Sequence, residues 1–150
     1  MIYFEDLQLG VEEHYGSYEV TREEVMDFAA KYDPQPFHLS DEAAARTHFG
    51  RLAASGWHTG AMAMAVIARK VVAEGQAGLG SPGLDELRWL KPVYPGDTLH
   101  VTGTVVDKRV SKSKPDIGIF KTQTKVTNQD GVPVMTFVSN VLIRRRPAAD

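Results

Sequence analysis

The uncharged stretch GAMAMAVIA, residues 60–68, decides the fold that we expect for this chain. It lies inside a longer segment, from about Trp57 to Glu74, that we predict to be a helix. A helix that is apolar on every face is a buried helix. Its small residues let neighbouring backbones approach closely. The sequence therefore predicts a central helix that is buried all round and wrapped by a sheet.

The residues after this helix alternate between apolar and polar, which is the pattern of strands with one buried face. The predicted strands cover four segments: Leu84 to Leu90, Thr98 to Arg109, Ile117 to Asn128 and Pro133 to Arg145. Gln129-Asp130-Gly131 predicts a hairpin turn between the last two, and Pro95-Gly96-Asp97 predicts another turn. Helices followed by a run of strands indicate an α+β fold with helices on an antiparallel sheet.

The first part of the chain predicts one strand and two helices. His14 to Val20 can form the strand. Thr21 to Glu24 matches a capping box, in which the Thr hydroxyl and the Glu carboxylate each bind a free backbone N–H at a helix start. Pro34 ends this helix, because the residue before a proline is displaced from the α region. A second, short helix begins at Ser40 and is closed by Gly50.

Length and composition restrict the class of protein. At 150 residues the chain fits one domain, residues 1–150. It has no cysteine, which excludes structural disulfides, thiolate nucleophiles and Cys-ligated metal sites. A net charge of −2 disfavours nucleic-acid binding. With no signal-peptide pattern and no stretch near the ~20 apolar residues of a membrane helix, we expect a cytoplasmic protein without a membrane partner.

The segment Tyr32-Asp33-Pro34-Gln35-Pro36-Phe37-His38 carries the strongest chemical signal. Its two prolines fix backbone φ angles and prevent a continuous helix, so we expect a rigid, extended loop. Such a loop can aim the Asp33 carboxylate and the His38 imidazole into one pocket. A carboxylate and a neutral imidazole that both reach one water form a workable acid–base pair near neutral pH. A turn aspartate and a structural histidine are the alternative interpretation.

A glycine, Gly56, opens the predicted central helix within Ser55-Gly56-Trp57-His58-Thr59. Glycine at a helix start lets a substrate approach the backbone, and the free N–H groups there carry partial positive charge. These N–H groups could donate to the thioester oxygen as negative charge develops on it in an enolate. Donors placed in this way often make the largest contribution to catalysis.

With these motifs the sequence resembles the MaoC-like dehydratases, which include the (R)-specific enoyl-CoA hydratases. The resemblance runs from about Gly10 to Arg146 and rests on the following residues: Phe28-Ala29, Asp33-x-x-Pro36-x-His38, Ala43-Ala44, Phe49-Gly50, Ser55 to Thr59, Lys91-Pro92-Val93 and Pro95-Gly96-Asp97. It implies a hot-dog fold, in which a long central helix is wrapped by a curved antiparallel β-sheet. It also implies a homodimer or a higher homo-oligomer, and pairing would close the open edge of the sheet.

The resemblance further implies a hydro-lyase of fatty-acid metabolism, an enoyl-CoA hydratase or 3-hydroxyacyl-CoA dehydratase. Such an enzyme adds water across the C2=C3 bond of a trans-2-enoyl-CoA to give an (R)-3-hydroxyacyl-CoA, or runs in reverse. The implied catalytic residues are Asp33 as the main acid/base, His38 as its partner and water orienter, and the backbone N–H of Gly56 as the donor to the thioester carbonyl.

We expect the substrate to be contacted by Gln35, Ser55, Trp57 and His58, and a packed or dimer-interface position is the alternative interpretation of His58. Two more candidates, Lys112 and Lys114, lie in a polar loop and could neutralise CoA phosphates, although a solvated hairpin explains them equally well. The sequence also departs from the family. Many relatives have Asn at the position of Gln35, and some have Ser where this chain has Met64, so acyl-chain preference stays open.

No metal site and no separate cofactor are expected, since coenzyme A enters as part of the substrate. His-x-x-x-His and paired-carboxylate spacings are missing, as are the Walker loop and the Gly-x-Gly-x-x-Gly motif. His48 and His100 follow no motif, so we expect them to face solvent. Trp57 and Trp89 are most simply core or interface aromatics.

Two other functions compete with hydration. A hot-dog thioesterase would use an acidic residue on or beside the central helix, but no carboxylate lies between Gly56 and Arg69. A non-catalytic acyl-CoA-binding module would not need both Asp33 and His38. No motif indicates the length of the substrate's acyl chain, the physiological direction of the reaction, or the choice between CoA and an acyl-carrier protein.

Overall fold

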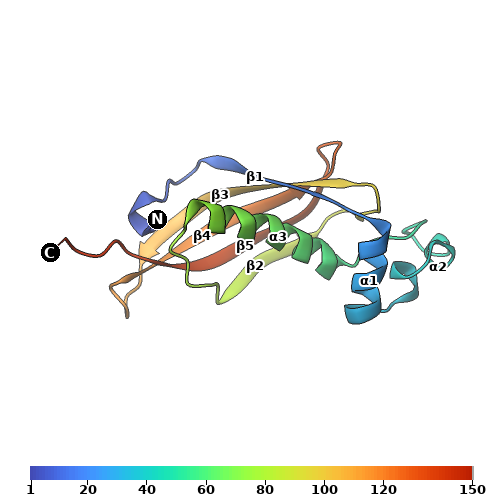
Figure 1. The fold of residues 1–150 in the computed structure, drawn as a ribbon, viewed down its shortest axis with the longest axis horizontal. Helices are drawn as coiled ribbons and strands as arrows, with labels where there is room; N and C mark the ends of the chain where they lie inside the picture. Colours follow the sequence, from blue (N-terminus) through green and yellow to red (C-terminus); the bar gives the residue numbers. More distant parts are fainter. Residues whose placement is uncertain (150) are drawn as a thin grey trace.

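The computed structural model describes residues 1–149, in which a long helix runs along one face of a five-stranded antiparallel sheet (Figure 1). The strand order in the sheet is β1-β3-β4-β5-β2. The elements follow the chain as η1 (Phe4–Asp6), β1 (Glu12–Glu19), α1 (Arg22–Tyr32), η2 (Pro36–His38), α2 (Asp41–Ala45), α3 (Gly56–Glu74), β2 (Gly83–Trp89), β3 (Thr98–Val110), β4 (Ile117–Thr127) and β5 (Pro133–Arg144). The predicted α+β architecture is confirmed.

All four strands predicted after the long helix form, and their ends differ from the expected ones by at most one residue. The predicted hairpin turn between β4 and β5 also forms. Gly131 there has φ +73°, a conformation that favours glycine, and its N–H donates to the carbonyl of Asn128 at 3.0 Å. Strands β3 and β4 were predictable because their residues alternate between a face on the core and a face toward solvent.

Helix α3 is buried on one face only, so the prediction of burial all round is wrong for the single chain. Met62, Ala63 and Val66 are at most 3 % exposed and pack on buried residues of β3, β4 and β5, namely Leu99, Val101, Val126, Val134, Met135 and Phe137. On the other face Met64 is 54 % exposed. The reason is geometric, because one sheet can cover only one side of a helix.

The capping box expected at the start of α1 is half formed. The Thr21 hydroxyl accepts a hydrogen bond from the Glu24 backbone N–H at 3.3 Å, as predicted. The Glu24 carboxylate, however, accepts a hydrogen bond from the Tyr18 hydroxyl at 2.6 Å. A tertiary contact has therefore replaced the local one. At α2 the predicted cap is present, since the Ser40 hydroxyl accepts from the Ala43 N–H at 3.1 Å.

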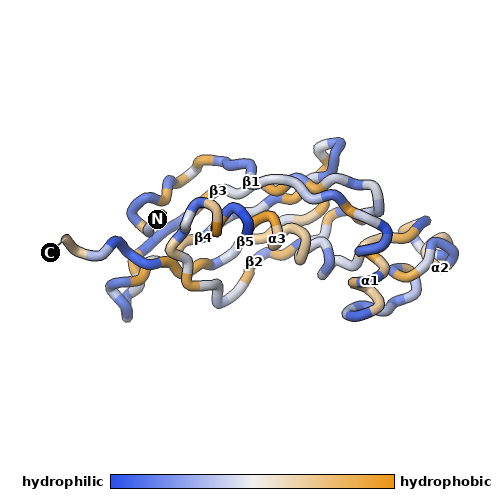
Figure 2. Tube along the Cα trace, viewed as in Figure 1, coloured by the Kyte–Doolittle hydropathy of each residue, from blue (hydrophilic) through white to orange (hydrophobic). Residues whose placement is uncertain are grey.

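The two ends of the sheet differ in what covers them (Figure 1). Helices α1 and α2 lie at the end where α3 begins, whereas both termini and the β3–β4 hairpin lie at the other end. In Figure 2 polar residues gather in the hairpin connections, while apolar residues recur along α3 and the strands behind it. The start of α3 is thus the place where loops from several elements converge.

Replacing Met62 by Ala should lower the free energy of unfolding by about 2–5 kcal/mol, because it leaves a cavity between α3 and the sheet. Val72, 79 % exposed on the same helix, is the matched control, and Val72→Ala should change that free energy by about 0.5 kcal/mol or less. Urea denaturation at a fixed protein concentration measures both. Equal losses in the two variants would contradict the assigned packing.

Candidate active site

Asp33 and His38 are brought together by the end of α1 and the short η2 helix. Asp33 caps α1, and its backbone N–H donates to the carbonyl of Ala29 at 2.9 Å. Pro36 then begins η2, where a proline costs no hydrogen bond, and η2 ends at His38. The expected extended loop is therefore one turn of 3₁₀ helix after a short extended step. The Asp33 Oδ2 and His38 Nε2 atoms are 3.4 Å apart.

The Asp33 carboxylate is held by two neutral donors. Gln35 Nε2 donates to Oδ1 at 2.7 Å, and the Ser55 hydroxyl donates to Oδ2 at 2.7 Å. Burial raises the pKa of Asp33, but these two hydrogen bonds and the proximity of His38 outweigh it, so the pKa lies below the ordinary value. Asp33 is consequently ionised at neutral pH.

The His38 ring is oriented by the backbone. It is 5 % exposed, and its Nδ1 lies 2.7 Å from the carbonyl oxygen of Ala53. Because a carbonyl only accepts, Nδ1 must carry a proton. In the neutral ring the Nε2 lone pair therefore faces the Asp33 carboxylate. Two acceptors 3.4 Å apart suit a water that lies beside both atoms and donates one hydrogen bond to each.

Helix α3 begins at Gly56, directly after the fully buried Ser55. The N–H groups of a first helical turn have no partner within the helix and carry partial positive charge. The Trp89 indole closes over this position, and its Nε1 donates to the Gly56 carbonyl at 2.9 Å. A Cβ at position 56 would lie 2.6 Å from the indole, so only glycine fits here.

These groups share one pocket of about 490 Å³. Its walls come from the end of α1, the loop before α3, the start of α3, and the segment after β2. The lining residues are Asp33, His38, His48, Phe49, Ala54, Gly56, Trp57, Thr59, Trp89, Leu90, Lys91, Pro92 and Val93. The arrangement puts an acid–base pair and a helix start at one cavity.

Of the residues predicted to contact the substrate, only Trp57 lines this pocket. Gln35 and Ser55 bind the Asp33 carboxylate, so they orient it. His58 is 2 % exposed and points away from this pocket toward α1, where its Nε2 lies 3.2 Å from Glu24 Oε1. Lys112 and Lys114 sit in the β3–β4 hairpin, at the opposite end of the sheet (Figure 1). Trp57 does line the pocket and is 64 % exposed.

Sequence reasoning missed two residues of the pocket. His48 is exposed, as expected, and also lines the pocket, where its ring is tilted against Phe49 at 4.1 Å between centroids. Trp89, expected in a core or interface, also forms the wall over Gly56, which the sequence did not indicate. A glycine at a helix start signals a close neighbour, but the neighbour comes from a distant strand. Among residues 1–149 no three potential metal ligands gather, and no helix is long and apolar enough to cross a membrane.

Two curated relatives resemble most of the chain. The protein YdeM of Bacillus subtilis, which is uncharacterized, is 30 % identical over 132 residues, covering 86 % of this chain and 89 % of that protein. The 3-hydroxybutyryl-CoA dehydratase of Methylorubrum extorquens is 32 % identical over 108 residues, covering 71 % of this chain and 66 % of that enzyme.

Solved structures share the architecture. The MaoC-like dehydratase from Rhodospirillum rubrum is 39 % identical, with a TM-score of 0.88 and coverage of 99 % of this chain and 100 % of that chain. A Mycobacterium tuberculosis protein with a double hot-dog fold is 17 % identical and has a TM-score of 0.84, covering 99 % of this chain and 46 % of that one. That second likeness concerns the fold alone, and it confirms the predicted hot-dog fold.

The family model that matches is described as the MaoC-like domain, and it spans residues 10–128. This span contains both partners of the 3.4 Å acid–base pair and the glycine that opens α3. By sequence and by fold, this protein belongs to the MaoC-like dehydratase domain family.

Proposed function

We propose that this chain, as one catalytic domain of residues 1–150, hydrates a trans-2-enoyl-CoA to an (R)-3-hydroxyacyl-CoA or catalyses the reverse dehydration. The observation that carries the proposal is the pair Asp33 and His38, 3.4 Å apart in the pocket that also contains the start of α3. The name of the M. extorquens relative, a 3-hydroxybutyryl-CoA dehydratase, supports a CoA thioester as substrate. This reaction would belong to fatty-acid metabolism in the cytoplasm.

In the hydration direction a water donates its hydrogen bonds to Asp33 Oδ2 and His38 Nε2. The thioester oxygen accepts from the Gly56 N–H, which draws electrons from the C2=C3 bond. As the water oxygen bonds to C3, Asp33 takes one of its protons and an enolate forms at the thioester. That proton then goes to C2, so water is added and the carboxylate is regenerated.

Three further groups support this chemistry. Gln35 and Ser55 keep the carboxylate ionised and fixed, and the Ala53 carbonyl keeps the Nε2 lone pair of His38 free. In the proposed complex Lys91, which lines the pocket, is the best-placed cation of this chain for CoA phosphate. Lys112 and Lys114 could serve the pocket only from a second copy.

We also propose that the active form is a homodimer. The strand β2 is a sheet edge, and apolar side chains gather beside it and on the uncovered face of α3: Trp57 64 %, Met64 54 %, Leu84 47 %, Trp89 44 % and Leu90 47 % exposed. Monomeric proteins rarely leave a large contiguous apolar patch open to water. Pairing would cover this patch and narrow the mouth of the pocket at Trp57 and Trp89.

Purified protein should hydrate crotonyl-CoA, and Asp33→Asn should lose about 10²–10⁴-fold in kcat because the amide cannot accept the proton. Asp130→Asn, in the β4–β5 turn, is the matched control and should keep wild-type activity. Loss of the conjugated thioester absorbance gives the rate, and chiral analysis of the product gives the configuration.

If Asp33→Asn hydrated crotonyl-CoA as fast as the wild type, the assignment of Asp33 would be wrong. If the wild type were inactive, longer, branched and dicarboxylic enoyl-CoAs would be tried next. Inactivity on all of them, with CoA still bound, would favour a non-catalytic acyl-CoA-binding module.

The pH dependence of kcat/KM tests the role of Ser55. Its hydrogen bond helps to hold the pKa of Asp33 below the ordinary value, so the ionised form persists into acid. Ser55→Ala should therefore move the acid limb of kcat/KM to higher pH, and Gln35→Leu should move it in the same direction. Because the depressed pKa stabilises the fold above the unfolded pKa of Asp, both variants should also lose stability at neutral pH more than at acid pH. An acid limb that stays in place in both variants would rule out this role.

Light scattering coupled to size exclusion measures the association state. We expect twice the 16.5 kDa chain mass for the wild type. Introducing charge on the proposed interface with Met64→Lys should shift the mass toward that of one chain. A wild type that elutes with the mass of a single chain would refute the dimer.

A further inference from the structure

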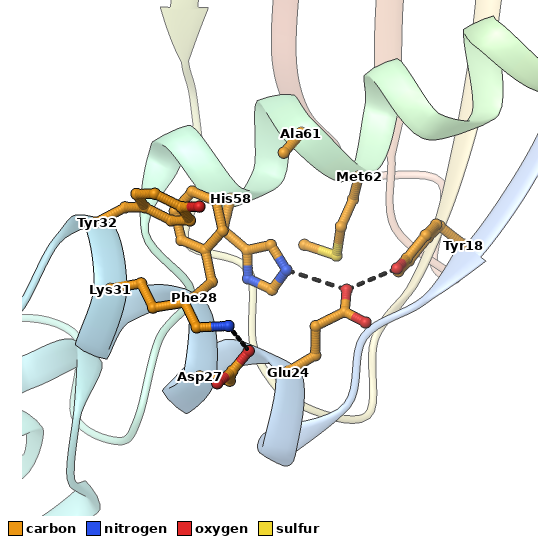
Figure 3. Close-up of a pocket in the computed structure, with 9 residues that line it drawn as sticks. All are labelled: Tyr18, Glu24, Asp27, Phe28, Lys31, Tyr32, His58, Ala61 and Met62. Atoms are coloured by element: carbon orange, nitrogen blue, oxygen red, sulfur yellow. Dashed lines mark hydrogen bonds and ion pairs between the residues drawn. The ribbon is translucent and has the colours of Figure 1, made fainter.

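A second, smaller hollow lies on the α1 side of α3 (Figure 3), and it shares no lining residue with the candidate active site. Its volume is about 200 Å³. It is bounded by Tyr18 from β1, by Glu24, Asp27, Phe28, Lys31 and Tyr32 from α1, and by His58, Ala61 and Met62 from α3. Three elements that are distant in sequence therefore meet here.

His58 connects these elements. Its ring is 2 % exposed and stacks on Phe28 at 4.7 Å between centroids, with the planes only 9° apart. Its Nε2 lies 3.2 Å from Glu24 Oε1, the same oxygen that accepts from the Tyr18 hydroxyl at 2.6 Å. In Figure 3 one carboxylate oxygen thus joins β1, α1 and α3.

The protonation state of this cluster follows from its contacts. The hydrogen bond from Tyr18 lowers the pKa of Glu24, so the carboxylate is charged and only accepts. Nε2 of His58 must therefore carry the proton. Burial lowers the pKa of His58, which Glu24 only partly offsets, so the ring is neutral. Its Nδ1 is a buried acceptor that has no partner in the described part of the chain.

The position of this cluster relates it to the active site. Glu24 and Phe28 lie on the helix that ends at Asp33, and Asp33 is bonded to the last turn of that helix through Ala29. His58 is two residues after Gly56, in the first turn of α3. A contact that holds α1 against the first turn of α3 therefore also holds the Asp33 carboxylate in place relative to the Gly56 N–H.

We propose that His58 and Glu24 form a latch that positions Asp33 against the start of α3, and so sets the geometry for proton transfer in the proposed hydration. Both are positioning residues, because neither lines the pocket of Asp33 and His38. The hydrogen bond between Ser55 and Asp33 at 2.7 Å is the second link between the same two elements. This inference rests on the proposed function for its effect on rate.

The kinetic test uses three latch variants and one control. Glu24→Gln removes the charge, His58→Phe keeps the stacking but removes the N–H donor, and His58→Gln restores a donor. Asp27→Asn is the control, since Asp27 lines the same hollow but pairs with Lys31 at 3.2 Å. Rates are measured with crotonyl-CoA at a temperature far below the unfolding midpoint of every variant.

Glu24→Gln and His58→Phe should lower kcat about ten- to a hundredfold with little change in KM, because a small misplacement of a catalytic group acts on the chemical step. His58→Gln should recover part of the loss relative to His58→Phe, and Asp27→Asn should match the wild type. Variants that melt earlier but keep the wild-type kcat would overturn the latch, because the contacts would then serve stability alone.

Hydrogen–deuterium exchange without substrate separates this inference from the proposed function. The latch predicts faster exchange of residues 30–38 in Glu24→Gln than in Asp27→Asn, whatever thioester the protein uses. Faster exchange supports the latch even if crotonyl-CoA is not a substrate. Equal exchange in the two variants, with both proteins folded, would refute it.

Discussion

The structure depends on the burial of one face of α3 against the sheet. Met62, Ala63 and Val66 follow helical spacing, so they form a stripe that meets the inner residues of β3, β4 and β5. Burying a large apolar side chain contributes about 1.5–3 kcal/mol to folding, and this contribution fixes the helix along the strands. This fixes the direction in which α3 begins, and with it the end of the sheet where Ser55 and Gly56 are presented. The site is therefore a consequence of the core.

At that end the fold buries polar groups, and each one constrains the next. Ser55 is fully buried and His38 is 5 % exposed. A buried donor or acceptor without a partner costs about 1–3 kcal/mol, so the chain adopts the arrangement that satisfies them. Ser55 donates to Asp33, and His38 to the Ala53 carbonyl. The Asp33 carboxylate and the His38 Nε2 atom are thereby left facing one another, which is the geometry that an acid–base pair requires.

Much of this could be predicted from the sequence, because local patterns set local structure. The alternation of apolar and polar residues predicted the four strands after α3. The spacing of the two prolines predicted the helix end that brings Asp33 near His38. The side on which a helical residue points could not be predicted without the partner element. His58, a candidate for the pocket, is instead buried against α1, whereas His48 is exposed, as expected, and also lines the pocket. The contact between Trp89 and Gly56 could not be predicted for the same reason, because the two residues are 33 positions apart in the sequence.

The departures from the local rules are not scattered over the chain. The half-formed capping box at Glu24, the inward-facing His58 and the glycine forced by Trp89 all lie around the first turns of α1 and α3. Sequences tend to violate local preferences where function imposes a second demand on a residue. The Glu24 carboxylate illustrates this, because it leaves a backbone N–H of its own helix in order to bind β1 and α3. A local hydrogen bond would stabilise α1 alone, whereas the tertiary one also fixes where α1 ends, and α1 ends at Asp33.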